Sequence, residues 1–145
     1  MTVTHQESLT SDLDPVVLYE ILRLRVDVFV VEQGCAYPEL DGRDVEPTAR
    51  QFWSTDDDDV AATLRLLHDG EDRRIGRVAT AQAARGRGFA GVLMQRAVDE
   101  CGGRAIHLDA QERLEGWYGR YGFERSGEDF VEDGLVHIPM TRAAR

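Results

Sequence analysis

The sequence predicts an α/β fold in which a layered sheet carries helices on both faces. Short β-prone runs alternate with stretches of helical periodicity along the chain, and Gly, Pro or Asp turn signals separate them. No internal repeat or linker interrupts this alternation. With 145 residues, of which 42% are hydrophobic and 30% charged, the chain has the length and composition of one domain spanning residues 1–145.

The overall charge limits the partners that we expect. A formal net charge of -10 at pH 7 disfavours nucleic acids and anionic membranes, because binding either requires clustered Lys and Arg. The N-terminal stretch MTVTHQESLTSDLD holds no apolar run long enough for a signal peptide or a membrane span. Cys35 and Cys101 lack a metal-ligand spacing. We therefore expect reduced thiols, no bound metal and a cytoplasmic location.

The first helix is predicted to follow a capping Asp14, with Pro15 at its first position. Apolar residues then recur at helical spacing as far as Val28 and Phe29. The helix ends in FVVEQG, where Gly34 stops it. The following stretch CAYPELDGRDVEP, residues 35–47, carries Pro and Asp-Gly turn signals over a long connection, and loops of that length often carry function.

Three strands are predicted next. Residues 49–55 and 60–67 read as a hairpin around the acidic turn Asp56–Asp59, for which a solvated turn is favoured over a calcium site because the alternating Asp/Gly pattern is absent. After the turn HDGEDRR, residues 75–81 form a short strand. Strand alternation favours the solvent face for Arg65, with a position facing an acidic substrate as the alternative.

The second half of the chain repeats the alternation of helix and strand. A helix is predicted from Phe89 to Cys101, ended by two glycines, then a strand over 105–111 and a short helix and turn over 112–123. Residues 135–142 form the closing strand, with Pro139 near an edge. Such an edge can pair with a second chain or stay covered, so the oligomeric state stays open and a homodimer is one of the alternatives.

The segment ARGRGFAGVLMQRAV places a basic, glycine-rich turn between a strand and a helix. The N–H groups and the dipole at a helix start favour an anion, glycines permit close approach of a pyrophosphate, and Arg85 and Arg87 add local positive charge. A merely structural turn is the alternative. The spacing fits neither a Walker loop nor a dinucleotide fingerprint.

Two motifs in this order carry a resemblance to a known family. The pattern Arg85-x-x-Gly88-x-Ala90 resembles the Arg/Gln-x-x-Gly-x-Gly/Ala motif of the GNAT superfamily of acyl-CoA-dependent N-acetyltransferases, and Trp117-Tyr118-x-x-x-Gly122-Phe123 resembles its later aromatic motif. The segments LRVDVFVVEQGCAYPELDGRD and EDGLVHIPM are similar to the ElaA-like branch of that superfamily. The resemblance covers the chain from about Leu22 to Met140.

This resemblance implies a GNAT-like fold: a mixed, mostly antiparallel central sheet of about six to seven strands with helices on both faces and a cofactor cleft between the two central strands. The implied cofactor is acetyl-CoA. Backbone groups of Val78, Ala79 and Thr80 would bind its pantetheine arm as an added strand. The pyrophosphate would lie on the turn formed by Arg85, Gly86, Arg87, Gly88, Phe89 and Ala90.

The sequence departs from the superfamily pattern at two positions near the implied cofactor. Gln111 stands where many members carry an Asn that bonds the cofactor, and Leu114 replaces a commonly small Ala. Glutamine supplies the same amide donor and acceptor from one methylene further out. Gln111 is therefore retained as a predicted cofactor contact.

The implied activity is transfer of an acetyl group to a primary amine of a small molecule or peptide. Tyr118 matches the family's usual general acid, with a packing role among neighbouring aromatic residues as the alternative. The donor to the developing oxyanion would be a backbone N–H near Val78 or Ala79.

The general base is open between two residues. Glu32 follows the apolar VFVV, where apolar surroundings would raise its pKa, although a surface glutamate is equally common there. His137 alternates with its neighbours on the last strand and has an imidazole that titrates in a useful range, although a structural histidine is the more common case. His107 and Asp109, on one face of the 105–111 strand, are weaker candidates for the cleft.

Two competing functions remain at this stage. In a non-catalytic acyl-CoA-binding module, the glycine turn would bind the cofactor while Tyr118 served only packing. RNA binding through RGRGF is disfavoured, because it requires repeated Arg-Gly segments or a wider basic face. The negative overall charge suits a cationic amine acceptor, but the sequence does not choose among acceptors.

Overall fold

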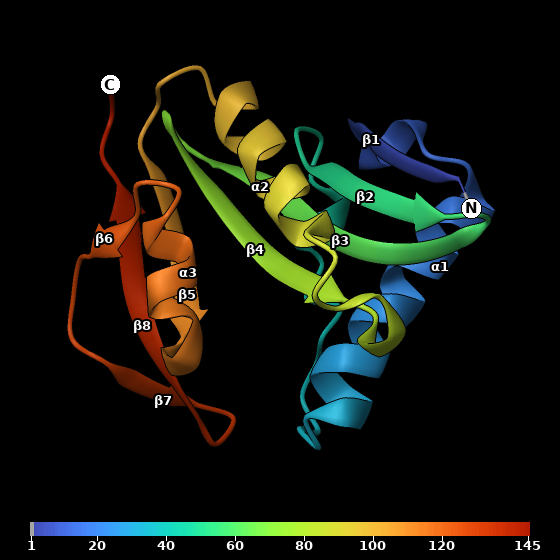
Figure 1. Ribbon diagram of the computed structural model, residues 1–145. Helices are drawn as coiled ribbons and strands as arrows, with labels where there is room; N and C mark the ends of the chain where they lie inside the picture. Colours follow the sequence, from blue (N-terminus) through green and yellow to red (C-terminus); the bar gives the residue numbers. More distant parts are fainter. Residues whose placement is uncertain (1) are drawn as a thin grey trace.

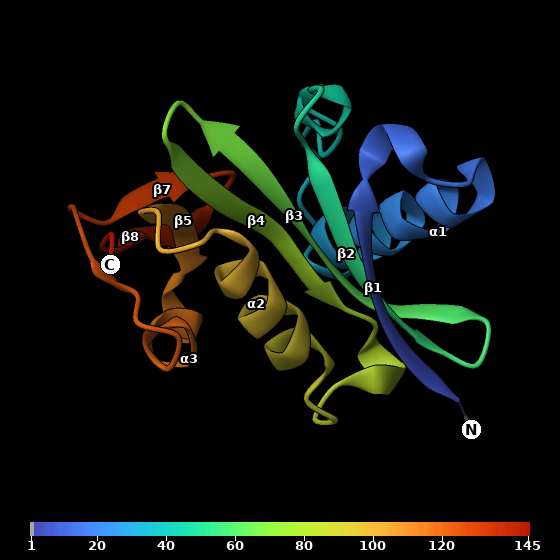
Figure 2. The same cartoon turned by 90° about the horizontal axis from the view of Figure 1, so that it is seen from above.

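The computed structural model describes residues 2–145, so Met1 of the predicted domain lies outside the described residues. One sheet of eight strands runs through it, with α1 on one face and α2 and α3 on the other (Figures 1 and 2). The elements are β1 Val3–Leu9, α1 Pro15–Val26, a π-helical turn Asp27–Glu32, β2 Arg50–Asp56, β3 Asp59–Asp69, β4 Asp72–Thr80, α2 Phe89–Glu100, β5 Ile106–Gln111, α3 Glu115–Gly119, β6 Glu124–Arg125, β7 Phe130–Glu132 and β8 Leu135–Arg142. Short 3-10 turns lie at Thr10–Asp12, Arg43–Val45, Gln82–Ala84 and Glu112–Leu114.

The sheet has the order β1-β2-β3-β4-β5-β8-β6, and the short β7 also pairs with β8. Every pairing is antiparallel except that between β4 and β5. This arrangement confirms the predicted mixed, mostly antiparallel sheet with helices on both faces. The two strands of the predicted hairpin are present, and so are the strands predicted over 105–111 and over 135–142. Their bounds lie within a few residues of the expected ones.

The prediction that residues 135–142 form an edge was wrong. Strand β8 pairs with β5 on one side and with β6 and β7 on the other. Pro139 is accommodated because it lies between the short β6 and β7, where its carbonyl oxygen accepts a hydrogen bond from the Ser126 N–H at 2.8 Å. Its missing N–H would face that same gap, so no ladder bond is lost.

Helix α1 begins as the sequence predicts. The Asp14 carboxylate accepts a hydrogen bond from the Val16 N–H at 2.8 Å, and Pro15 occupies the first helical position. Ile21, Leu24 and Val28 are buried against the sheet. From Asp27 to Glu32 the backbone widens into a π-helical turn, a feature that often marks functional sites. This turn carries Glu32 to the side of the cleft described below.

Helix α2 covers the opposite face (Figure 2). Its buried side chains Phe89, Leu93, Met94, Ala97 and Val98 pack with apolar residues of β2 to β5 and β8 to form the main core. The helix begins directly after Gly88, whose backbone is left-handed with φ of 81°. The basic turn of residues 85–88 therefore lies between the end of β4 and the first residue of α2.

The structure contains a strand that the sequence did not predict. Strand β1 pairs with β2 along its whole length, from Val3↔Asp56 to Leu9↔Arg50. Its sequence VTHQESL is largely polar, and its side chains are half-buried or exposed. Strand β1 lies at the edge of the sheet and has no buried apolar face of its own. Its strand conformation therefore depends on its pairing with β2.

The prediction that Arg65 faces solvent was also wrong. Arg65 is 5% exposed and donates two hydrogen bonds to the Asp41 carboxylate, at 2.8 and 2.7 Å. It belongs to a cluster of arginines and carboxylates from α1, the 35–47 loop, β3 and β4. We call this cluster the buried ion network, and it comprises Arg25, Glu39, Asp41, Asp44, Arg65 and Arg77. Three of its carboxylates come from the loop, so the loop is fixed to the sheet.

Strands β4 and β5 separate after a short contact. Only Arg73↔Ile106 and Arg74↔His107 pair, and beyond them the two strands diverge (Figure 1). On its other edge β4 contains a bulge, because the register passes from Arg65↔Gly76 to Thr63↔Ala79. Arg77 in this bulge has a left-handed backbone with φ of 53°. The divergence leaves the last two thirds of β4, from Ile75 to Thr80, without a strand partner on the β5 side.

Candidate active site

A cleft of about 800 Å³ lies between the diverging strands β4 and β5. Most of the predicted site residues line it: Glu32, Val78, Ala79, Thr80, Arg85, Gly86, Gly88, Phe89, Ala90, Gln111, Tyr118 and His137. Arg87 does not line this cleft, since its guanidinium contacts Asp56 at 2.6 Å and lies over the Phe89 ring. Residues that are far apart in the sequence are thus brought to one cavity.

The edge of β4 supplies backbone groups to this cleft. The Ala81 N–H donates to the Ala61 carbonyl of β3 at 2.8 Å, so it points away from the cleft. Because successive backbone groups in a strand point to opposite edges, the N–H of Thr80 faces the cleft. The same alternation favours Val78 over Ala79 as the second donor. An extended ligand can therefore bind along this edge as an added strand.

The glycine turn has room for an anion. Gly86 and Gly88 have left-handed backbones, with φ of 80° and 81°, which other residues adopt only with strain. A Cβ atom at either position would have no neighbouring atom within 4 Å, so the space beside the turn is open. The first N–H groups of α2 lack partners within the helix and are directed toward this space. These features fit a pyrophosphate group.

The two arginines of the turn are paired with carboxylates. Arg85 donates two hydrogen bonds to Glu32, each 2.7 Å long, and Arg87 donates one to Asp56 at 2.6 Å. The expectation of a raised pKa for Glu32 was wrong. The hydrogen bonds from Arg85 lower the pKa of this partly exposed carboxyl instead, because they stabilise its charged form.

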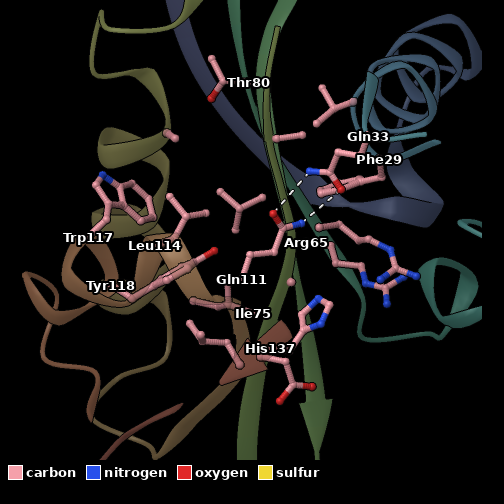
Figure 3. A pocket seen from close by; sticks show the side chains of 18 of the residues that line it. Phe29, Gln33, Arg65, Ile75, Thr80, Gln111, Leu114, Trp117, Tyr118 and His137 are labelled. Atoms are coloured by element: carbon pink, nitrogen blue, oxygen red, sulfur yellow. Dashed lines mark hydrogen bonds between the residues drawn. The ribbon is translucent and has the colours of Figure 1, made fainter. Parts of the chain in front are cut away.

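Tyr118 packs against its aromatic neighbours and also reaches the cleft. Its ring makes edge contacts with Trp117 and Phe123, at centroid distances of 5.0 and 6.3 Å. Figure 3 shows its hydroxyl pointing into the cavity, and within residues 2–145 this hydroxyl has no hydrogen-bond partner. Burial raises the pKa of Tyr118, so the phenol remains protonated at neutral pH. Both sequence-based interpretations of Tyr118 are therefore compatible with its position.

His137 presents one ring nitrogen to the cleft. Its Nδ1 lies 3.0 Å from the Leu135 carbonyl oxygen, and its ring stacks on Phe130 at a centroid distance of 5.5 Å. A carbonyl oxygen accepts only, so Nδ1 carries the proton and Nε2 of the neutral ring is left as an acceptor.

The two weaker candidates on β5, His107 and Asp109, lie in different surroundings. Asp109 lines the cleft and lies 3.5 Å from Arg74. His107 does not line the cleft, because its ring nitrogens contact Thr141 at 3.0 Å and Asp72 at 2.8 Å. It holds strands β4, β5 and β8 together at the point where β4 and β5 still pair.

Gln33 is a cleft residue that the sequence did not single out. Its side-chain amide faces that of Gln111 across the cleft (Figure 3). The Gln111 Nε2 donates to the Gln33 Oε1 at 3.2 Å, and the Gln33 Nε2 lies 3.5 Å from the Gln111 Oε1. The two residues are 78 positions apart, so no local pattern signals the contact. Only the neighbouring Glu32 pointed to this part of the helix end.

Comparisons with known proteins place this geometry in a family. The model of the acetyltransferase (GNAT) domain matches residues 29–144. A UPF0039 protein of Mycobacterium tuberculosis is 46% identical over 98% of this chain and 94% of its own length. Among solved structures, an acyl-CoA N-acyltransferase from Pseudomonas aeruginosa has a TM-score of 0.92 and 38% identity, covering 98% of this chain and 100% of that one. Escherichia coli ElaA has a TM-score of 0.91 and 33% identity, covering 97% and 99%.

None of the helices within residues 2–145 is long and apolar enough to cross a bilayer.

Proposed function

Because this chain belongs to the acetyltransferase (GNAT) domain family, we propose that it transfers an acetyl group from acetyl-CoA to a primary amine. One observation carries the proposal. The unpaired edge of β4, the open glycine turn and the Tyr118 hydroxyl all face the same cleft of about 800 Å³. That combination provides a track for an extended arm, a site for a diphosphate and a proton donor.

The residues present fit the proposed cofactor. The edge of β4 at Val78 to Thr80 would hold the amide groups of the pantetheine arm, and the backbone of Arg85 to Ala90 would hold the pyrophosphate. Gln111 lies on the opposite wall, where its amide can contact the arm. Positive charge from Arg85 would favour the diphosphate once its pairing with Glu32 is broken.

Acetyl-CoA supplies the acetyl group as a thioester and leaves as a thiol. Tyr118 would donate the proton that the departing sulfur takes up, because its hydroxyl faces the cleft and is protonated. Its raised pKa makes the phenol a weak acid, so its placement beside the sulfur must compensate. The Val78 N–H on the cleft-facing edge of β4 would donate to the acetyl oxygen as that oxygen gains negative charge.

His137 is the better supported of the two bases. Its Nδ1–H bond to the Leu135 carbonyl leaves Nε2 to accept a proton from the acceptor amine, directly or through water. Glu32 has a lowered pKa while it is paired with Arg85, which weakens it as a base. The acceptor itself would be a small molecule or peptide that bears a primary amine.

The experiment compares a Tyr118→Phe variant with the unaltered protein, using acetyl-CoA and a panel of polyamines, aminoglycosides and lysine peptides. Release of the CoA thiol measures turnover. We expect Tyr118→Phe to lower kcat by about 100-fold or more, the contribution of a positioned acid. The matched control is Tyr121→Phe, which removes a hydroxyl from the same motif outside the cleft lining and leaves kcat within about twofold.

Two results would contradict the proposal. Equal turnover by Tyr118→Phe and the unaltered protein would remove Tyr118 as the acid. Binding of acetyl-CoA without thiol release for any amine would instead favour the non-catalytic acyl-CoA-binding module.

A further inference from the structure

Two consecutive residues at the end of the π-helical turn reach across the cleft. Glu32 contacts Arg85 of the glycine turn through two hydrogen bonds of 2.7 Å. Gln33 contacts Gln111 of β5 through its side-chain amide, at 3.2 and 3.5 Å (Figure 3). The Gln33 backbone N–H also bonds to the Val28 carbonyl at 3.2 Å, which anchors this segment to the π-helical turn. We call these two cross-cleft contacts the clasp.

The clasp occupies the side-chain groups that the cofactor would need. All three nitrogens of the Arg85 guanidinium already donate, Nε to the Thr80 carbonyl and the other two to Glu32. The two parallel bonds to Glu32 have the geometry by which arginine binds a phosphate group. A diphosphate can therefore bind Arg85 through the same two parallel bonds only when Glu32 leaves. The carboxylate imitates the anion that this site is proposed to receive.

The amide of Gln111 is engaged in the same way. Its Nε2 donates to Gln33, and its Oε1 accepts from Gln33 and from Arg113, the latter at 2.5 Å. A pantetheine amide that uses the N–H now bonded to Gln33 must displace Gln33. Both contacts come from one short segment, the consecutive residues Glu32 and Gln33 at the end of the π-helical turn.

We propose that Glu32 and Gln33 form an autoinhibitory clasp over the cofactor cleft, and that CoA binding opens it by taking Arg85 and Gln111 as partners. This inference rests on the proposed function. The two contacts of the clasp compete with different parts of the ligand. The diphosphate displaces Glu32, and the pantetheine arm displaces Gln33. The clasp therefore weakens binding of the whole cofactor, which must displace both contacts, more than binding of pantetheine, which must displace only one.

The experiment measures dissociation constants by titration calorimetry for two probes, CoA and pantetheine, which lacks the diphosphate. Glu32→Gln removes the competing charge, so CoA is expected to bind about two- to fivefold more tightly while pantetheine is unchanged, the range for an exposed ion pair. Gln33→Ala removes the competing amide, so both probes are expected to bind about two- to fivefold more tightly.

Two exposed residues serve as matched controls. Glu128→Gln makes the same charge change and Gln95→Ala the same amide deletion, and neither residue lines the cleft. Both controls are expected to leave the two dissociation constants unchanged. A shift in Glu128→Gln equal to that in Glu32→Gln would assign the effect to overall charge and would overturn the clasp.

The outcomes separate the clasp from the proposed function. Tight CoA binding by the unaltered protein, with equal or weaker binding by Glu32→Gln and Gln33→Ala, would overturn the clasp alone. Binding of CoA by the Glu32→Gln/Gln33→Ala double variant but not by the unaltered protein would support a strong clasp. If neither protein binds CoA, the clasp and the proposed function are both wrong.

Discussion

Two of the regions that hold arginine–carboxylate pairs, the buried ion network and the glycine turn, differ in exposure. In the buried ion network, the side chains of Arg25 and Glu39 are 0% and 2% exposed and 2.8 Å apart. At the glycine turn, those of Arg85 and Glu32 are 41% and 37% exposed and 2.7 Å apart. The distances are alike, so the surroundings distinguish the two pairs.

This difference determines what each region can do. A buried charge that loses its partner cannot recover its hydration, so the network must remain intact and it fixes the 35–47 loop against β3 and β4. In an exposed pair, the attraction between the two charges is nearly offset by the hydration that each regains on separation. Arg85 can therefore exchange Glu32 for another anion at little cost in free energy. We infer that the first region is structural and the second is available to a ligand.

The largest effect is expected from breaking the network at its centre. Asp44→Ala removes one of the two carboxylate partners of Arg25 and of Arg65, which keep only Glu39 and Asp41, so the free energy of unfolding should fall by about 3 kcal/mol. Urea denaturation followed by circular dichroism measures it. The control Glu20→Ala, which breaks an exposed pair with Arg23, should cost less than about 0.5 kcal/mol. Similar losses in both variants would remove the distinction between the regions.

The network should also make stability fall in acid. Hydrogen bonds from Arg65 hold the pKa of Asp41 well below its ordinary value of 3.8. Burial opposes ionisation of Asp44, but hydrogen bonds and charge from Arg25 outweigh it and lower that pKa as well. At a pH below the ordinary pKa of these carboxyls, the unfolded chain binds more protons than the folded chain. The stability that the ionised carboxyls contribute is therefore complete above about pH 5 and is lost as the pH falls through their folded pKa values.

Urea denaturation between pH 7 and pH 3 tests this dependence. Asp44→Asn should lose less stability in acid than the unaltered protein, because the asparagine does not titrate. Parallel curves for the two proteins would contradict the assignment of the acid sensitivity to the network.

At the glycine turn the expected effect is on binding rather than stability. Arg85→Ala should change the free energy of unfolding by less than about 1 kcal/mol, since its ion pair is exposed. The same variant should weaken CoA binding about tenfold or more, the value of a charge-assisted hydrogen bond. Arg87→Ala, in the same turn but outside the cleft lining, should have the smaller effect on binding. Calorimetry measures both affinities. A larger loss of CoA affinity in Arg87→Ala than in Arg85→Ala would place the diphosphate beside Arg87 instead.

The smallest expected effect concerns the two cysteines, which differ in burial as the two ion-pair regions do. They form no disulfide among the described residues. Burial raises the pKa of Cys101 to about 11, so its thiol should not react in the folded protein. Cys35 is half-buried and lines the cleft. Iodoacetamide followed by mass spectrometry should modify Cys35 alone, and modification of Cys101 at a similar rate would indicate that the core opens.

Much of the fold could be predicted because its signals are local. The Asp14-Pro15 helix start, the acidic hairpin turn and the glycines ahead of α2 each depend on neighbouring residues, and each is present in the structure. Strand β1 was missed because its polar sequence acquires a strand conformation only through pairing with β2.

The site was predicted less completely, because charge partners are set by tertiary contacts. Arg65 sits in an apolar strand, yet its burial depends on Asp41 and Asp44 from a loop that precedes it by about twenty residues. Glu32 follows an apolar run, yet its partner Arg85 lies 53 positions away. Alternation and composition give no information on such pairs, so the pKa of Glu32 was predicted in the wrong direction.

The central claim is that the cleft between β4 and β5 binds an acyl-CoA, and thermal unfolding with added ligand tests it most directly. At about 100 times the dissociation constant, acetyl-CoA should add about 2.7 kcal/mol of stability and raise Tm by about 5–10 °C. Free CoA should act similarly, whereas ATP, which lacks the pantetheine arm, should leave Tm unchanged. An unchanged Tm at every acetyl-CoA concentration would contradict the account and leave the glycine turn as a structural turn.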